Sequence, residues 1–113
     1  MVSINNFSKL ALSFEAASAL PHFEKTSFRV NKKIFATLDE TKSRAVVKFT
    51  TEEQPVFCLY DNTIIYPVPG KWGLQGWTMI ELQKIKTAML KDIVTTSYRA
   101  VAPKKLAEKY KQP

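Results

Sequence analysis

The sequence predicts an α+β fold in which a helix at each end of the chain packs on one face of an antiparallel sheet. Three observations favour this fold. Apolar residues recur every three to four positions near both ends, they alternate with polar residues in the segments between, and polar stretches separate those segments. A chain of 113 residues suits one domain, so we expect a single domain over residues 1–113.

The first element is a helix, and Ser3 is suited to be its N-cap. The apolar stripe of this helix has the spacing of an amphipathic helix and consists of Ile4, Phe7, Leu10, Ala11, Phe14 and Ala17. We expect the helix to end before Leu20-Pro21, because a residue that precedes proline avoids the α region.

Three strands then follow as an antiparallel meander. Residues 27–30 and 33–38 favour two strands, and Asn31-Lys32 between them predicts a tight hairpin turn of the primed type. A polar loop over residues 39–43 leads to a third strand over residues 44–49, with two valines at its centre. The sheet is therefore expected to be built mainly from neighbouring segments.

The segment after the meander begins with a capping-box pattern, a hydroxyl at Thr50 followed three residues later by Glu53. It predicts a short helix or turn that ends near Tyr60.

Two further strands are expected after this turn. Residues 64–66 are apolar, but the prolines that follow restrict them to a sheet edge. Residues 71–76 are expected to form a loop, since they hold two glycines that tolerate positive φ. Residues 77–82 predict the last strand, with Trp77 in the core.

The C-terminal helix is expected from about Lys84, where the three-to-four spacing returns, and it ends at Pro103. Residues 106–113 are too polar to add much core. We expect them to fray as a basic tail, with at most a short helical turn.

Charge is unevenly distributed along the chain. The sequence holds 17 lysines and arginines against 10 acidic residues, a formal charge of +7. Residues 1–83 carry nine basic and eight acidic residues, whereas residues 84–113 carry eight and two. A basic terminal third indicates either a polyanionic partner or a solubilising tail.

Enzymatic chemistry has little support in the sequence. His22 is the single histidine and Cys58 the single cysteine, so no zinc site of paired histidines or cysteines can form. Glycine-rich phosphate loops and nucleophile motifs are absent. We therefore expect no catalytic residue, no metal site and no cofactor. No apolar stretch reaches the ~20 residues that span a bilayer, so we expect a cytoplasmic protein without a membrane partner.

Several segments together resemble the MmcQ/YjbR family, over roughly residues 5 to 106. The segments are Leu20-Pro21-His22-Phe23-Glu24-Lys25-Thr26-Ser27-Phe28-Arg29-Val30, Lys32-Lys33-Ile34-Phe35-Ala36-Thr37-Leu38, Val46-Val47-Lys48-Phe49, Gly76-Trp77 and Ser97-Tyr98. The resemblance implies a CyaY-like, or frataxin-like, two-layer sandwich. It also implies a DNA-binding protein.

The expected function is nucleic-acid binding, with DNA contacted through its phosphates by basic side chains. Trp72 is the candidate for stacking on a base or wedging into a groove. The candidate cations are Arg29, Lys32, Lys33, Lys48, Lys71, Arg99, Lys104 and Lys105. For any single one of these cations, an ordinary solvated surface residue is the favoured interpretation.

Two alternatives to nucleic-acid binding stay open. One is a protein-interaction or dimerisation module that uses the open sheet face, and the other is a small-molecule binder with a pocket near Trp72. The oligomeric state does not follow from the sequence, and a monomer is the default expectation.

Overall fold

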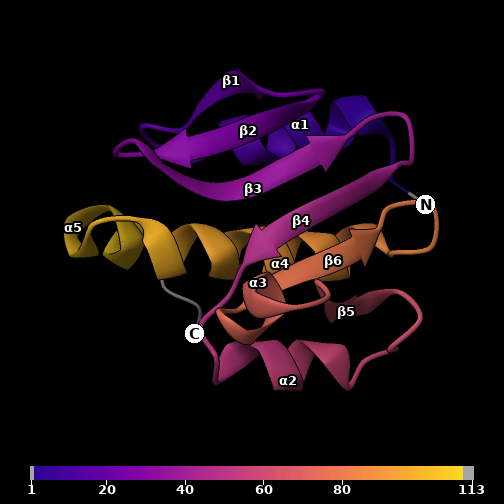
Figure 1. Ribbon diagram of the computed structural model, residues 1–113. Coiled ribbons are helices and arrows are strands. Elements are labelled where there is room, and N and C mark those ends of the chain that lie inside the picture. The colour runs from indigo at the N-terminus through magenta and orange to yellow at the C-terminus, as the bar shows by residue number, and fades with distance from the viewer. Residues whose placement is uncertain (1, 111–113) are drawn as a thin grey trace.

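The computed structural model describes residues 2–110 as a six-stranded antiparallel sheet with helices packed against it (Figure 1). The strands are β1 (Ser18–His22), β2 (Lys25–Val30), β3 (Lys33–Asp39), β4 (Arg44–Lys48), β5 (Ile65–Pro67) and β6 (Trp77–Glu81). The helices are α1 (Ile4–Leu12), α2 (Glu53–Cys58), α3 (Lys71–Leu74), α4 (Thr87–Val101) and α5 (Lys104–Ala107), followed by a 3-10 turn over Glu108–Tyr110. The strand order is β1-β2-β3-β4-β6-β5.

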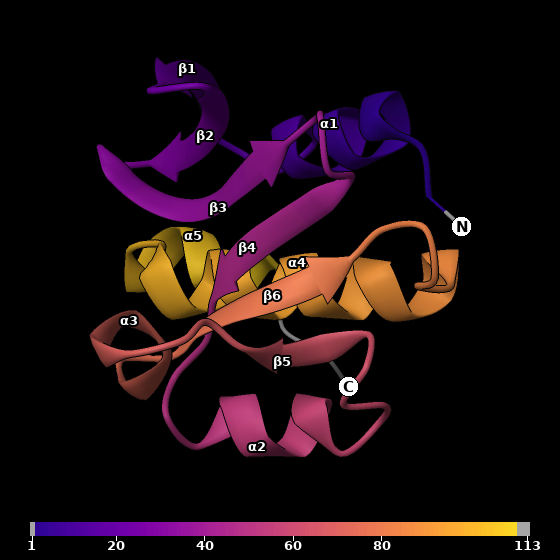
Figure 2. The same ribbon diagram turned by 45° about the vertical axis from the view of Figure 1, so that its right-hand side comes forward.

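Helices α1 and α4 cover the same face of the sheet, which confirms the expected α+β fold. Both lie behind the strands when the sheet is viewed from its open side (Figures 1 and 2). Phe7 of α1 packs edge-on against Phe28 of β2, with ring centroids 5.7 Å apart. Helix α4 contacts β3 and β4. Among residues 2–110, no helix is long and apolar enough to cross a membrane.

The core lies between the sheet and these two helices. Tyr98 of α4 is fully buried at its centre, stacked on Phe14 at 4.7 Å and edge-on to Phe35 at 5.5 Å. Strands β3, β4 and β6 add alternate residues to this core, namely Ala36, Leu38, Ala45, Val47, Thr78 and Ile80. Because successive side chains of a strand point to opposite faces, the residues between these core positions lie on the other, open face of the sheet.

The N-terminal helix is shorter than the apolar spacing predicted. Ser3 caps it as expected, with its Oγ accepting a hydrogen bond from the Asn6 N–H at 3.1 Å. However, α1 ends at Leu12, and the predicted helix end around Leu20-Pro21 is instead the edge strand β1. Pro21 is compatible with a strand here because an edge strand has one side without a partner.

Two local predictions from the sequence match the backbone. Asn31 and Lys32 both have positive φ, 52° and 69°, as a primed two-residue hairpin turn requires. In the capping box, the Thr50 N–H donates to Glu53 Oε1 at 2.9 Å, and the Glu53 N–H donates to Thr50 Oγ1 at 3.1 Å. These reciprocal bonds satisfy two backbone donors at the start of α2.

The C-terminal segment up to residue 110 is packed, which corrects the expected fraying of residues 106–110. The Tyr110 ring lies edge-on to Phe14 at 5.0 Å, and its hydroxyl accepts a hydrogen bond from the Glu15 N–H at 2.9 Å. Lys109 forms an ion pair with the Glu15 carboxylate. The rest of the expected tail, residues 111–113, lies outside the described residues.

Candidate functional site

Three cross-strand rows of side chains cover the face of the sheet that α1 and α4 leave open. The first row is Asp39, Arg44 and Glu81, the second is Thr37, Val46, Met79 and Tyr66, and the third is Lys48 and Trp77. Neighbouring rows are two residues apart along each strand, or about 6.6 Å. The open face therefore changes from a charged row to a largely apolar row and then to a lysine–tryptophan pair.

A groove of about 340 Å³ lies over the second and third rows. Ile34, Thr37, Val46 and Met79 line it from the strands. His22 and Lys25, at the tip of the β1–β2 hairpin, line one side, and Val68, Trp72 and Trp77 line the other. The groove is thus mostly apolar, with a lysine at the hairpin side.

Two tryptophans form the aromatic part of the groove. The rings of Trp72 and Trp77 meet edge to face, with centroids 6.5 Å apart. Trp72 is 62% exposed and presents a free ring surface. Trp77 was expected in the core but lies half-buried on the open face, with the Lys48 Nζ 5.9 Å from its ring centroid. That distance suits a cation–π contact.

Helix α3 presents Trp72, although residues 71–76 were expected to be a loop. Two glycines allow the helix to lie close to its neighbours. A Cβ at Gly73 would approach the Val68 carbonyl oxygen to 1.9 Å, and a Cβ at Gly76 would approach that of Phe49 to 2.0 Å. Gly76 also has a φ of 105°, which other residues rarely adopt.

The side chain of Gln54 joins α2 to α3 and β6 beneath the tryptophans. Its Nε2 donates to the Gly73 carbonyl oxygen at 3.0 Å and the Thr78 Oγ1 at 3.0 Å, and lies 3.2 Å from the Trp77 carbonyl oxygen. Gln54 thereby helps to fix the position of α3, and with it Trp72.

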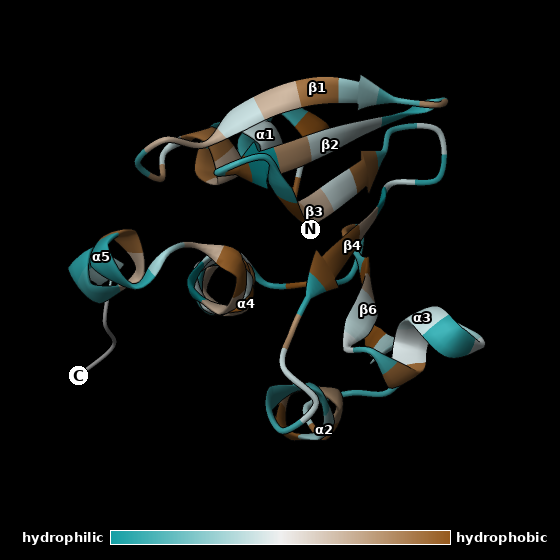
Figure 3. Cartoon of the chain, turned by 60° about the vertical axis from the view of Figure 1, so that its left-hand side comes forward, coloured by the Kyte–Doolittle hydropathy of each residue, from teal (hydrophilic) through white to brown (hydrophobic). Residues whose placement is uncertain are grey.

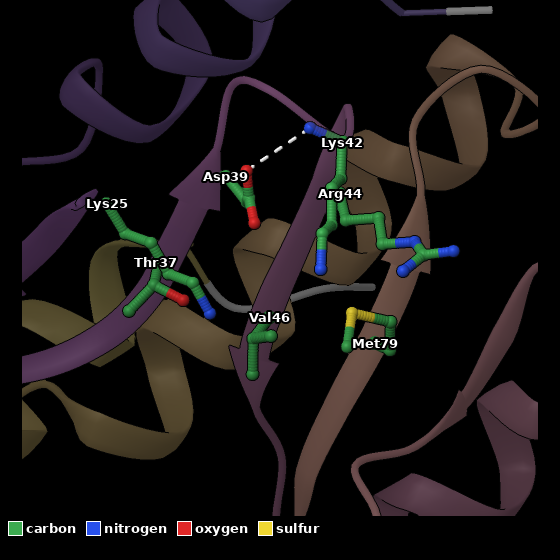
Figure 4. Close-up of a pocket in the computed structure, with 7 residues that line it drawn as sticks. All are labelled: Lys25, Thr37, Asp39, Lys42, Arg44, Val46 and Met79. Atoms are coloured by element: carbon green, nitrogen blue, oxygen red, sulfur yellow. Dashed lines mark hydrogen bonds between the residues drawn. The ribbon is translucent and has the colours of Figure 1, made fainter.

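A narrower hollow of about 70 Å³ adjoins the groove towards the first row (Figure 4). The hollow and the groove share Lys25, Thr37, Val46 and Met79, so they lie side by side. Asp39, Lys42 and Arg44 complete the lining of the hollow. Figure 4 shows the Lys25 side chain directed past Thr37 towards β4, and the Lys42 side chain running along β4 beside Arg44.

A network of one ion pair and one hydrogen bond lies at the Glu81 end of the first row. Arg44 Nε lies 3.0 Å from Glu81 Oε2, and the Tyr66 hydroxyl donates to the same carboxylate. Burial raises the pKa of Glu81, but the hydrogen bonds from Tyr66 and Arg44 together with the Arg44 charge bring it below its ordinary value. Burial and the bond to Glu81 also raise the pKa of Tyr66.

Arg44 therefore already forms an ion pair with a carboxylate, whereas two lysines of the hollow do not. Within residues 2–110, no carboxylate oxygen lies within 4.0 Å of the Lys25 or Lys42 ammonium nitrogen. The Asp39 carboxylate lines the same hollow, and its Oδ1 accepts a hydrogen bond from the Lys42 backbone N–H at 3.2 Å. The hollow thus combines two ammonium groups with one opposing carboxylate.

Some candidate cations from the sequence already bond to protein groups. Lys48 Nζ donates to the carbonyl oxygens of Phe49, at 3.1 Å, and Gln75. Arg99 Nε donates to the Ala107 carbonyl oxygen at 3.2 Å, which attaches α5 to α4. Arg29 Nε likewise donates to a neighbouring side chain, the Ser27 Oγ at 3.1 Å.

The other candidate cations do not gather on one surface. Lys71 belongs to α3, and Lys104 and Lys105 are exposed on α5. These two helices lie on opposite sides of the sheet (Figure 3). Lys32 is exposed at the β2–β3 turn, and Lys33 lines a separate depression beside the C-terminal end of α4. Of the sequence candidates, Lys48, Lys71 and Trp72 lie on the α3 side of the open face.

The sequence prediction missed most of the residues that line the groove and hollow, notably Lys25, Asp39, Lys42, Arg44 and Met79. Strand alternation is the signal that could have placed Asp39 and Arg44 on the open face. No three histidine, cysteine or acidic side chains within residues 2–110 are grouped to hold a metal ion.

Comparisons with known proteins agree with this fold. The family model described as YjbR matches residues 12–100. The chain is also similar to the crystal structure of the Deinococcus radiodurans protein DR2400, which carries a DUF419 domain. The TM-score is 0.80 at 17% identity, over 100% of this chain and 91% of that one. No curated protein matches the sequence. The chain belongs to the YjbR family.

Proposed function

We propose that this YjbR-family protein binds nucleic acid on the open face of its sheet, with unpaired bases against Trp72 and Trp77. The observation that supports the proposal is the groove between the β1–β2 hairpin tip and α3. This groove joins an exposed aromatic ring to an apolar floor, and it has lysines near both ends. That combination is typical of surfaces that bind single strands.

The aromatic end of the groove is suited to a base. Every base has a flat face that can stack on an aromatic ring, so the interaction tolerates different sequences. The exposed face of Trp72 is free for such a contact, and Val46 and Met79 offer apolar surface beside it. A duplex hides the faces of its bases, so the groove favours single strands over duplexes.

The cations near the groove supply the contacts to phosphates. Lys71 precedes Trp72 on α3, and Lys25 and Lys42 lie at the other end, in the hollow. The formal charge of +7 adds a general attraction for a polyanion, which salt weakens. Helix α5, which holds Lys104 and Lys105, lies on the far side of the sheet (Figure 3), so in this proposal these two lysines contribute only that general attraction.

Fluorescence anisotropy tests the proposal, using a labelled single-stranded oligonucleotide, the duplex of the same sequence, and a series of salt concentrations. We expect the single strand to bind more tightly, with an affinity that falls as salt rises. Trp72→Ala should weaken binding roughly fivefold or more, because stacking of one base contributes about 1–3 kcal/mol.

The matched control is the double variant Lys104→Ala/Lys105→Ala, which removes two cations from the helix-covered side. It should lower affinity slightly for both nucleic acids and retain the preference for the single strand. The proposal fails if the wild-type protein shows no salt-dependent binding at low ionic strength. It also fails if Trp72→Ala binds the single strand as tightly as the wild-type protein does.

A second candidate function is the binding of a small, planar, apolar molecule. The volume of the groove, about 340 Å³, favours it because small-molecule sites commonly have ~300–1,000 Å³. Such a ligand would quench tryptophan fluorescence with an affinity that does not depend on salt. The salt series therefore separates the two functions.

A further inference from the structure

We infer that the hollow lined by Lys25, Thr37 and Lys42 is a phosphate subsite, and that the groove takes a dinucleotide unit between this subsite and the tryptophans. The inference rests on the proposed function and specifies its ligand. It assigns the two adjoining depressions to two different parts of the same ligand.

The charges in the hollow favour an anion. The ammonium groups of Lys25 and Lys42 have no carboxylate partner within 4.0 Å in residues 2–110, and the Thr37 hydroxyl can donate a hydrogen bond beside them. Arg44 adds little net charge because Glu81 neutralises it. Asp39 opposes an anion, so two positive charges face one negative charge.

The spacing of the rows sets the length of the ligand. The row that holds Asp39 and Arg44 is four residues along the strand from the row that holds Lys48 and Trp77. Four residues of a strand span about 13 Å. A nucleoside monophosphate is too short to place its base at Trp77 and its phosphate beside Asp39. A ligand with one further unit between base and phosphate can reach both.

The apolar row between the two ends identifies that further unit. Val46 and Met79 lie in the row between, where they border both the hollow and the groove, and neither can pair with a charged group. The polyphosphate of a nucleoside triphosphate would place charged oxygens over these side chains, which is unfavourable because they offer no hydrogen bonds. A dinucleotide carries fewer charges between its ends, because only its one internal phosphodiester lies there, and its second sugar and base add surface that can contact these side chains. The groove therefore favours a dinucleotide that carries a terminal phosphate.

Tryptophan fluorescence titrations test this inference with four probes. The probes are a nucleoside, a nucleoside triphosphate, a dinucleotide, and the same dinucleotide with a terminal phosphate. We expect the phosphorylated dinucleotide to bind most tightly, roughly threefold to fivefold more tightly than the unphosphorylated one, as one exposed ionic contact allows. The triphosphate should bind more weakly than the phosphorylated dinucleotide.

Two variants of the hollow sharpen the test. Asp39→Asn removes the opposing charge but retains the oxygen that accepts the Lys42 N–H, so it should raise affinity for the phosphorylated dinucleotide. Lys42→Ala should lower that affinity, and neither change should alter binding of the nucleoside. Lys104→Ala is the control on the other side of the sheet, and thermal unfolding verifies that each variant folds.

The outcomes separate the subsite from the function on which it rests. If both dinucleotides bind equally and Asp39→Asn changes nothing, the phosphate subsite is wrong while nucleic-acid binding stands. A triphosphate that binds more tightly than the phosphorylated dinucleotide overturns the assignment of the ligand. If the wild-type protein binds neither dinucleotide nor a longer single strand, both proposals fail.

Discussion

The two faces of the sheet are built from alternate residues of the same strands but differ in what they leave accessible. On β4, Val47 is fully buried beneath the helices, whereas its neighbour Val46 lines the groove on the open face. The helix-covered face is filled by side chains that contact only other protein atoms. The open face has free aromatic and cationic groups. Stability and binding are therefore expected to depend on different residues of the same strands.

The open face also shows which of its charges are used internally. Arg44 and Tyr66 both bond to the Glu81 carboxylate, and Lys48 bonds to backbone carbonyl oxygens, so these groups stabilise the surface. Lys25 and Lys42 have no such carboxylate partner in the described residues. The comparison thus separates residues that stabilise the face from those that are available to a ligand.

The largest effect on stability is expected from Phe35→Ala. Phe35 is fully buried against Tyr98, so the change removes apolar contact and leaves a cavity. We expect a loss of roughly 3–5 kcal/mol in the free energy of unfolding, measured by urea denaturation. Trp72→Ala, on the open face, should cost less than about 1 kcal/mol. Similar losses for the two variants would contradict the division between the faces.

The neighbours Val47 and Val46 provide a matched pair on one strand. Val47→Ala should cost roughly 1.5–3 kcal/mol, because it opens space in the core, whereas Val46→Ala should cost under about 1 kcal/mol. Urea denaturation of both variants measures the difference, and oligonucleotide binding should be weakened only by Val46→Ala. If the larger loss of stability came from Val46→Ala, the assignment of strand faces would be wrong.

An effect smaller than those of the core variants is expected from Glu81→Gln, and it depends on pH. Folding lowers the pKa of Glu81 below its ordinary value of 4.5. The ionised carboxylate therefore stabilises the folded protein at pH values above 4.5, and this stabilisation is lost as the pH falls through the pKa of the folded state. We expect the wild-type protein to be more stable than the variant by roughly 1 kcal/mol at neutral pH. The difference should shrink below pH 4.5, as measured by urea denaturation at several pH values. A difference that is constant across this range would exclude the linkage.

Much of the fold follows from local patterns in the sequence. The hairpin turn at Asn31-Lys32 and the capping box at Thr50 and Glu53 involve only neighbouring residues, and the structure has both. Strand β1 was missed because a proline within a short run of alanine and leucine resembles the end of a helix. Only its position at the sheet edge, which depends on the whole topology, makes a strand with Pro21 acceptable.

The candidate site was harder to predict because it depends on strand faces and on tertiary partners. Residues 77–82 have large apolar side chains and one polar residue on each face, so the sequence does not reveal that Thr78 and Ile80 point inward while Trp77 and Met79 point outward. Likewise, no local pattern shows that the Arg99 guanidinium bonds to a carbonyl oxygen of α5. Charge composition left a polyanionic partner and a solubilising tail as alternatives, and it did not show which lysines are free.

The position of β6 between β4 and β5 has a consequence for the order of folding. Strands β1 to β4 pair with neighbours in the chain, but Arg44 and Glu81, which pair between β4 and β6, are 37 residues apart. Closing such a long loop costs more entropy than closing a hairpin, so non-local pairings are slow to form. The groove needs both β4 and β6 for its floor, and it can exist only after this closure. Trp77, at the start of β6, is a built-in fluorescent reporter of that step during refolding.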